Sequence, residues 1–286
     1  MKQIKIGTCV PGAKAEEWLK GFIGKGFETF SLNLHMSLEG TDLDKLALST
    51  EKLLAGTDSE ITTVGYYCNP IQYAEHRKTL ENVICTAGKF GATHVSTFAG
   101  AWEGKPVESA YEEFGKVFRE LADLAEEKGV KLGIENCLMD GTWEHATCNI
   151  GFNPKAWEVM FEEVKNDNFG LEWEPTHQMV QLIDPVTELR KWCKKIVHIH
   201  GKDATIDWDA VRHSGISGAV PFVWHRMPGF GDTNWRDIIS ILRSNGYEDD
   251  ICIEGYHDPV YSGELEMTGQ LHALNYLKSV SYTHLR

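Results

Sequence analysis

The chain lacks any cysteine pattern that would indicate a disulfide framework or a structural zinc site. Its seven cysteines are scattered through 286 residues, are odd in number and include no Cys-x-x-Cys pair. Several lie in or beside apolar runs, where a reduced thiol packs as a small hydrophobic group. No apolar stretch is long enough to span a bilayer, and the first residues run into a predicted strand without a signal-sequence core. We therefore expect a cytoplasmic protein with no membrane partner.

Basic residues are scarce as well. Lys and Arg number 28 against 42 Asp and Glu, which gives a formal net charge of −14. Because a phosphate backbone is bound through a footprint of Lys and Arg, this balance argues against a nucleic-acid partner. No Gly-x-Gly-x-x-Gly motif follows the first predicted strand, which argues against a dinucleotide-binding open sheet. No linker or low-complexity tract divides the chain, so we expect one domain.

The sequence does contain a regular alternation of short β-rich runs and longer amphipathic runs. Strands are predicted near residues 4–9, 29–35, 60–67, 94–99, 131–136, 168–174, 196–201 and 251–255. Helices are predicted near residues 14–24, 42–54, 76–90, 107–128, 154–165, 184–194, 234–246 and 264–278. Eight strand–helix units favour an α/β fold, a (β/α)₈ TIM barrel, as a single domain over residues 1–280. We expect residues 281–286 to be an unstructured tail, and 137–153 and 203–233 to be long functional loops.

Four apolar runs in the second half of the chain end in a side chain that can bind metal. These side chains are Glu135, Glu174, His200 and Glu254. An unpaired buried charge is costly, so four strand ends of this kind suggest a shared counter-charge, and the C-terminal strand ends of a barrel converge. Three carboxylates and one imidazole suit a single Mn²⁺ ion, with Mg²⁺, Co²⁺ or Zn²⁺ as alternatives. The competing interpretation is that one or more of the acids only pairs with Lys or Arg.

Several segments resemble one enzyme family. They are residues 149–154, 170–177, 183–185, 198–203, 226–231 and 253–254. Together they are similar to the sugar phosphate isomerase/epimerase family of xylose isomerase-like TIM barrels, most specifically from about residue 131 to residue 278. The resemblance implies the same ligand set, Glu135, Glu174, His200 and Glu254. It also contains a departure, because relatives carry Asp where this chain has Glu174, whose extra methylene must be accommodated.

The resemblance implies chemistry at a carbon next to a carbonyl. In that reading Glu135 and Glu254 are the catalytic acid/base pair, and the metal favours proton removal by stabilising an enediolate. His177 and Arg226 are implied to bind substrate. The predicted activity is that of a divalent-metal-dependent sugar isomerase or epimerase in carbohydrate metabolism, with a small-molecule carbohydrate as its partner. By analogy with related barrels, a homo-oligomer is expected.

Three further residues are candidates for substrate binding, each with a structural alternative. Lys202 follows a predicted strand, where adjacent opposite charges are as often solvated or structural as functional. His257 follows the last predicted strand and is also suited to a turn. Trp102 follows the fourth predicted strand and would either line a sugar pocket or pack against the core.

Three rival functions remain open from the sequence. A lyase or dehydratase acting on a keto-sugar, keto-glycoside or keto-inositol would use the same metal site and the same proton removal. An apurinic endonuclease would need a multi-zinc site, which the acidic balance and the scarcity of further strand-end histidines disfavour. A sugar-binding barrel without catalysis is disfavoured by the intact predicted ligand set.

Overall fold

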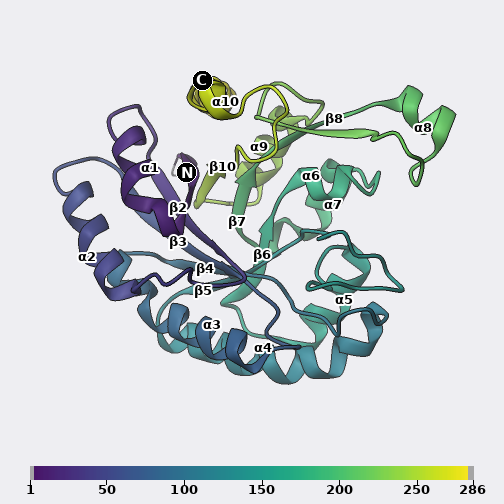
Figure 1. Ribbon diagram of the computed structural model, residues 1–286, viewed down its shortest axis with the longest axis horizontal. Coiled ribbons are helices and arrows are strands. Elements are labelled where there is room, and N and C mark those ends of the chain that lie inside the picture. Colours follow the sequence, from purple (N-terminus) through teal and green to yellow (C-terminus); the bar gives the residue numbers. More distant parts are fainter. Residues whose placement is uncertain (1–2, 283–286) are drawn as a thin grey trace. The chain divides into compact units, whose positions relative to one another are not determined.

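The computed structural model describes residues 3–282 of the chain. Eight parallel strands form a closed barrel in the order β1-β10-β7-β6-β5-β4-β3-β2 (Figure 1), which confirms the predicted (β/α)₈ architecture. The barrel strands are β1 (Lys5–Pro11), β2 (Thr29–His35), β3 (Glu60–Tyr67), β4 (His94–Thr97), β5 (Lys131–Glu135), β6 (Phe169–Trp173), β7 (Ile196–Gly201) and β10 (Asp250–Ile253). Strands β4, β6, β7 and β10 are buried at every position, as expected for parallel strands covered on both faces.

Helices follow the strands at nearly the predicted positions. The α-helices are α1 (Ala15–Phe22), α2 (Leu43–Leu54), α3 (Ala74–Thr86), α4 (Tyr111–Glu127), α5 (Pro154–Glu163), α6 (Pro175–Met179), α7 (Pro185–Trp192), α8 (Trp208–Ser214), α9 (Trp235–Ser244) and α10 (Glu266–Tyr282). Short 3₁₀ turns lie at Gly12–Lys14, Ala87–Phe90, Val107–Ala110, Cys193–Lys195 and Gly263–Leu265. None of the described helices is long and apolar enough to cross a membrane.

Local sequence explains where several helices begin. The side chains of Asp42, Asn153, Asp184 and Asn234 each accept a hydrogen bond from a backbone N–H in the first turn of the helix that follows. These caps satisfy N–H groups that have no partner within the helix. Pro154 and Pro185 occupy the first helical position, where proline costs no hydrogen bond.

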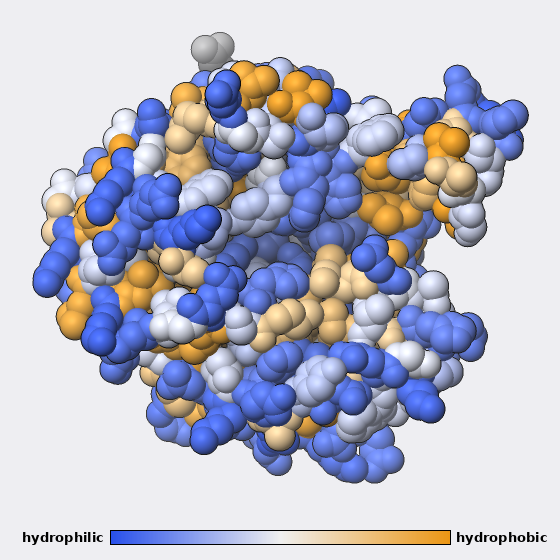
Figure 2. All heavy atoms as spheres, in the orientation of Figure 1, coloured by the Kyte–Doolittle hydropathy of each residue, from blue (hydrophilic) through white to orange (hydrophobic). Residues whose placement is uncertain are grey.

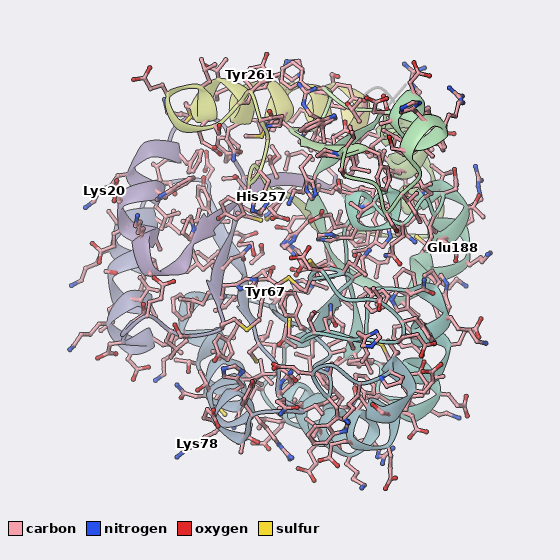
Figure 3. All side chains as sticks on the ribbon, turned by 45° about the vertical axis from the view of Figure 1, so that its right-hand side comes forward. Lys20, Tyr67, Lys78, Glu188, His257 and Tyr261 are labelled. Carbon is pink, nitrogen blue, oxygen red and sulfur yellow. The ribbon has the colours of Figure 1, made fainter. Side chains whose placement is uncertain are left out.

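The chain divides into two compact units, and strands β1 and β7 contribute residues to both. Unit 2 comprises Cys9–Trp173 and Lys195–Ile199. In this unit, helices α1 to α5 lie along the outer side of strands β2 to β5 (Figure 1). Lys20 on α1 and Lys78 on α3 point outward, whereas Tyr67 at the end of β3 lies on the inner side (Figure 3). The helices therefore bury one face and leave a charged face to solvent.

Unit 1 comprises Met1–Thr8, Glu174–Lys194 and His200–Arg286. It contains an antiparallel hairpin that the sequence did not predict, formed by β8 (Asp203–Ile206) and β9 (Val223–Arg226) with α8 between them. The long loop predicted over residues 203–233 contains these three elements, which the sequence did not indicate. The cause is that β8 and β9 have four residues each and leave several of them partly exposed, so neither carries a buried apolar run.

The hairpin and α8 also present apolar side chains to solvent. Trp208, Ile216, Val220 and Trp224 are between 43% and 62% exposed. Figure 2 shows the corresponding hydrophobic surface around α8, at the upper right of the view. We call these four residues the apolar tip of the hairpin.

Helix α10 extends further than predicted. It includes residues 281 and 282, which belong to the expected tail, and Ser281 is fully buried. Its carbonyl oxygen accepts a hydrogen bond of 2.6 Å from Nη2 of Arg243 on α9, which extends the helix past the predicted end. Residues 283–286 of the expected tail lie outside the described residues.

Candidate metal centre

Three of the predicted ligands lie together within unit 1. Glu174 directly follows β6, His200 is the fifth residue of β7, and Glu254 directly follows β10. The C-terminal ends of parallel strands point the same way, which explains why these distant segments meet. Each of the three offers one ligand atom, and these atoms lie within 4.8 Å of one another.

The geometry of these side chains is close. His200 Nδ1 lies 3.4 Å from Glu254 Oε2 and 3.8 Å from Glu174 Oε2. Glu174 is fully buried, His200 is 1% exposed and Glu254 is 9% exposed, so all three are largely removed from water. Carboxylates at this depth need a compensating positive charge.

Lys202 supplies part of that positive charge. Its Nζ lies 2.9 Å from Glu254 Oε1 and 4.0 Å from Glu174 Oε1, and the side chain is 2% exposed. Lys202 is therefore buried and paired, and the interpretation of it as a solvated surface lysine is wrong. The competing interpretation of the acids was that they pair with lysine or arginine. The structure contains such an ion pair between Glu254 and Lys202.

Burial and neighbouring charges shift the pKa values of Glu254 and His177. Burial opposes ionisation of Glu254, but attraction to Lys202 and contacts with Glu174 and His200 outweigh it, so the pKa of Glu254 lies well below its usual value. Burial, followed by repulsion from Lys202, holds the pKa of His177 well below that of an ordinary histidine. At neutral pH Glu254 is a carboxylate and His177 is an uncharged imidazole.

The residues present fit a divalent cation. Two buried carboxylates and one imidazole nitrogen give a mixed oxygen and nitrogen donor set at close range. Such a set suits Mn²⁺, Mg²⁺, Co²⁺ or Zn²⁺, and the cluster contains no thiolate that would favour a structural zinc ion. Lys202 carries a single positive charge, and its Nζ lies near both carboxylates.

The other substrate-binding candidates of unit 1 lie around this cluster. His177 on α6 places Nε2 3.3 Å from Glu174 Oε1. Arg226 at the end of β9 directs Nε to Asp258 Oδ2 at 3.3 Å and lies over the ring of Phe230. His257 belongs to the same loop as Asp258, with a left-handed backbone (φ 72°), and is a neighbour of the ring of His225.

Asp258 fixes the position of this loop against β9. Its Oδ2 accepts a hydrogen bond from the backbone N–H of Met227 at 2.8 Å, and its Oδ1 accepts hydrogen bonds from the N–H groups of Val260 and Tyr261. Figure 3 shows His257 on the inner side of unit 1, whereas Glu188 on α7 points outward. The loop after β10 is thus held by Asp258, and His257 directly precedes this residue.

Two predicted site residues belong to unit 2. Glu135 is the last residue of β5 and is 6% exposed. Its carbonyl oxygen accepts a hydrogen bond of 2.9 Å from Asn149 Nδ2, which also bonds the carbonyl of Cys137 and so holds the start of the long loop. Trp102 lies in the loop after β4 and is partly buried. The roles of both residues stay predictions.

Sequence reasoning missed a second layer of polar residues inside unit 2. Glu172 on β6 accepts a hydrogen bond from Tyr67 Oη at 2.8 Å and lies 2.6 Å from His198 Nδ1. Glu172 and His198 are both fully buried. Each lies two positions before a predicted ligand, Glu174 or His200, so strand alternation gives both the same side of the sheet. The two-residue spacing to Glu174 and His200 could have identified Glu172 and His198 from the sequence.

The fold and the buried cluster define an α/β barrel with a carboxylate and imidazole centre at the C-terminal ends of its strands. The chain belongs to the xylose isomerase-like TIM barrel family, whose model matches residues 25–280. The resemblance found in the sequence is thereby confirmed at the level of the family.

Individual relatives are more distant. An inosose dehydratase from Clostridium tetani (strain Massachusetts / E88) is 26% identical over 170 residues, which are 58% of this chain and 54% of that protein. The chain thus spans about half the length of this curated relative. Among solved structures, a xylose isomerase domain protein from Planctomyces limnophilus has a TM-score of 0.73 and 17% identity, covering 99% of this chain and 97% of that chain. A D-psicose 3-epimerase has a TM-score of 0.71 and 15% identity, covering 97% and 99%. These two structures share the fold.

Proposed function

We propose that this protein is a divalent-metal-dependent enzyme that removes a proton from the carbon next to the carbonyl of a sugar or polyol-derived ketone. Return of the proton at another position or face gives isomerisation or epimerisation. The observation that carries the proposal is the buried cluster of Glu174, His200 and Glu254, whose ligand atoms lie within 4.8 Å of one another. Membership of the xylose isomerase-like family supports it.

The proposed ligands are Glu174, His200 and Glu254, with Glu135 as the fourth. Glu135 is supported by its place as a buried carboxylate at the C-terminal end of a barrel strand. We propose Mn²⁺ as the ion, because an oxygen-rich donor set with one imidazole suits it. A divalent ion in this position would stabilise the negative charge that develops on the substrate oxygen.

Glu254 is the proposed base. Its carboxylate form at neutral pH, which the nearby Lys202 favours, is the form that accepts a proton. Glu135 is the proposed second acid/base group, which would handle the proton on the other side of the same carbon. His177 and Arg226 are proposed to hydrogen-bond substrate oxygens, and the contact between Arg226 and Asp258 orients the guanidinium for this task.

A second candidate is a lyase, specifically a dehydratase. The relative from Clostridium tetani is an inosose dehydratase, and that observation favours this outcome. The first step is the same proton removal, but the resulting carbanion then expels a hydroxyl group from the neighbouring carbon as water.

Replacing Glu254 with Gln tests the shared step. We expect turnover to fall by about 10²–10⁴-fold, because the amide cannot accept the proton. Turnover would be measured by NMR as exchange of the substrate α-proton in D₂O, over a panel of ketoses, aldoses, 3-keto-glycosides and keto-inositols with Mn²⁺-loaded protein. Glu264→Gln is the matched control, because Glu264 is an exposed glutamate of the same unit and should leave turnover unchanged. Near-wild-type turnover by the Glu254→Gln variant, on a substrate that wild type accepts, would end the proposal.

The same NMR experiment separates the two outcomes. An isomerase or epimerase returns a product of equal mass apart from the deuterium gained. A dehydratase returns a product that has lost water, and a glycoside-cleaving lyase returns two fragments.

A further inference from the structure

Strands β6 and β7 pair in a register that is interrupted once. Leu171 on β6 is opposite Ile196 on β7, but the next residue, Glu172, is opposite His198. Val197 is therefore one residue extra in β7, which makes it a β-bulge. Bulges are rare between parallel strands, and they change the direction of side chains near them. The whole bulge lies within unit 2.

The bulge decides which side of the sheet the side chains at the end of β7 face. Successive side chains of a strand alternate between the two sides, and paired residues of neighbouring strands face the same side. Glu174 continues the alternation of β6, since its backbone is still extended (φ −129°, ψ 121°). The bulge puts His198 opposite Glu172. Two positions further, His200 and Glu174 therefore also face the same side. In an uninterrupted register Val197 would be opposite Glu172, and both histidines would face the other side.

Two glycines leave the room that the bulge needs. Gly133 on β5 is directly opposite Gly170 on β6. A Cβ atom at Gly170 would lie 2.5 Å from Val197 Cγ1, and one at Gly133 would lie 3.1 Å from Val197 Cγ2. The Gly170 Cβ would also lie 2.5 Å from the carbonyl oxygen of Lys195, just before the bulge. Val197 therefore occupies space that a larger residue at Gly170 would fill, so three neighbouring strands are matched to the bulge.

A buried hydrogen-bonded group holds the strands where regular pairing resumes. Glu172 Oε1 lies 2.6 Å from His198 Nδ1, and Glu172 Oε2 accepts a hydrogen bond of 2.8 Å from Tyr67 Oη. Glu172 and His198 are fully buried, and Tyr67 is 3% exposed. Separating β6 from β7 at this point would leave buried polar atoms without these partners, which costs more than the bonds contribute when formed. The three side chains therefore favour one register of the two strands.

Stability alone does not explain this group. A carboxyl group and an imidazole lose their hydration when they are buried, and apolar side chains of similar volume often give an equally stable or more stable fold. Apolar side chains pack without directional bonds, so they do not select a register, whereas Glu172 and His198 meet in one register only. Specification of a register is the best-supported use of buried polar groups of this kind.

We propose that Glu172, His198 and Tyr67 are positioning residues of the candidate metal centre. By holding the bulge, they keep His200 on the same side as Glu174, where His200 Nδ1 lies 3.8 Å from Glu174 Oε2. The three residues contact neither metal nor substrate in this role, and they act through the ends of β6 and β7. The inference rests on the proposed function and explains how two of its proposed ligands are brought together.

Calorimetry of Mn²⁺ binding to the full chain tests this role. Glu172→Leu removes both hydrogen bonds, and we expect the Kd for Mn²⁺ to rise about 10–100-fold, as for other groups that hold metal ligands in place. Glu172→Gln keeps a hydrogen-bonding group toward both partners and should stay within about fivefold of wild type. Tyr67→Phe removes only one of the two bonds and should raise the Kd by about three- to tenfold. It decides the case if Glu172→Leu does not fold.

Thr50→Val on α2 is the matched control. The Thr50 hydroxyl is also fully buried, and it donates a hydrogen bond of 3.0 Å to the carbonyl oxygen of Leu46. Its loss should lower the thermal midpoint and leave the Kd for Mn²⁺ unchanged. A Glu172 side chain with a merely structural role would behave like this control.

Hydrogen exchange of the metal-free protein, measured by mass spectrometry, provides a readout that needs no ion. In Glu172→Leu, peptides covering residues 168–174 and 195–200 should exchange about tenfold faster than in wild type, while the peptide covering residues 29–35 of β2 should not change. In Thr50→Val the exchange of the β6 and β7 peptides should not be selectively faster.

An unchanged Kd in Glu172→Leu overturns the inference. So does a Glu172→Gln variant that binds Mn²⁺ as weakly as Glu172→Leu, because positioning needs the hydrogen bonds and not the charge. Absence of Mn²⁺ binding by wild type rejects the proposed metal-dependent function, and hydrogen exchange then decides the bulge: selectively faster exchange supports its role, and unchanged exchange overturns it. Unchanged turnover in Glu254→Gln rejects the proposed function and leaves both readouts of the bulge intact.

Discussion

At the scale of single residues, the main feature of the candidate metal centre is a buried lysine beside two carboxylates. Lys202 Nζ is 2.9 Å from Glu254 and 4.0 Å from Glu174, so a metal ion would share these carboxylates with an ammonium group. A buried charge pair is costly to separate once formed, because each partner would be left uncompensated. The positive charge of Lys202 therefore holds the two acids in place.

Single residues at strand ends were the most predictable part of the site. Glu174, His200 and Glu254 were singled out because an acid or imidazole at the end of an apolar run is unusual, and they lie together. The bulge at Val197 could not be found in that way, because β7 is buried at every position and shows no break in its own sequence. It depends on the register of β6 and β7, which is a long-range property of the chain.

At the residue scale, the contribution of Asp258 to the free energy of unfolding can be tested by its pH dependence. Its pKa is lowered: burial opposes ionisation, but hydrogen bonds from the backbone of Tyr261, Met227 and Val260, together with the charge of Arg226, outweigh burial. The stability that it contributes is therefore present above the unfolded pKa, near 4, and is lost as the pH falls through the lower folded value. Asp258→Asn should reduce the free energy of unfolding at pH 7 by about 1.5–3 kcal/mol, and the difference from wild type should narrow below pH 4.

Urea unfolding at a series of pH values provides the measurement. Asp209→Asn is a suitable control, because the Asp209 side chain is 96% exposed and pairs with Arg212 on the surface. That change should stay within about 0.5 kcal/mol at neutral pH. A difference between Asp258→Asn and wild type that is constant from pH 7 to pH 3 would contradict the role given to the carboxylate.

At the scale of elements, the alternation of strands and helices was predictable from periodicity. The predictions for β2, β3 and β7 have the observed bounds, and the other barrel strands differ by one or two residues at their ends. Buried parallel strands are continuous apolar runs, and the helices between them have one apolar face, so each pattern is distinct. The ends of strands are the part of such a prediction that periodicity determines least.

Helix α6 and strands β8 and β9 were not predicted, and the physical reason is the same for all three. Helix α6 has five residues and follows Glu174 directly, and β8 and β9 have four residues each. An element of this length completes less than two turns of helix or only two alternations of a strand, so it has no readable period. Its conformation is set by contacts with distant parts of unit 1, such as the hydrogen bonds from Gly229 and Thr233 to Asp203.

The loop after β9 depends on close contact of glycine with β8. A Cβ atom at Gly231 would lie 2.5 Å from the carbonyl oxygen of Ala204 and also against the Asp203 carboxylate. Gly231→Ala should therefore displace the loop and lower the free energy of unfolding by about 1–3 kcal/mol. The change should also weaken substrate binding, since the same loop continues from Arg226.

Thermal unfolding and KM measure the two effects of this glycine. Gly21→Ala in α1 serves as the matched control, because nothing lies within 4 Å of the added methyl group. Alanine has the higher helix propensity, so the control should be unchanged or more stable by up to about 1 kcal/mol. Equal stability of Gly231→Ala and wild type would show that the loop has room for the methyl group.

For the whole molecule, the proposed metal binding would be a measurable source of stability. The chain carries a formal charge of −14, and part of that charge is concentrated in the buried cluster. A ligand that binds only the folded state at 100 times its Kd contributes about 2.7 kcal/mol. Mn²⁺ should therefore raise the thermal midpoint by roughly 5 °C above that of chelator-treated protein.

His200→Ala provides the control for that measurement, because it removes one proposed ligand and should abolish most of the increase. Mg²⁺, Co²⁺ and Zn²⁺ would be compared in the same assay to rank the ions. An increase of the same size in the His200→Ala variant would place ion binding elsewhere on the molecule.

The closed barrel was predictable at this largest scale because eight repeated units leave few alternatives. The division into two compact units was not, since no linker or change in composition marks it. The order of strands follows from short connections, whereas the grouping of segments depends on how side chains pack over long sequence separations.

The β8–β9 hairpin separates two tasks that enzymes often combine on one element. The proposed metal ligands of unit 1 belong to the ends of barrel strands, but Arg226, which is proposed to bind substrate, belongs to a separate two-stranded sheet. Substitutions along that sheet leave the hydrogen-bond ladder of the barrel intact. Selection for a new substrate can therefore change the β8–β9 hairpin without changing the barrel strands. Exchange of this hairpin between relatives offers a route to altered specificity in which the proposed metal ligands are kept.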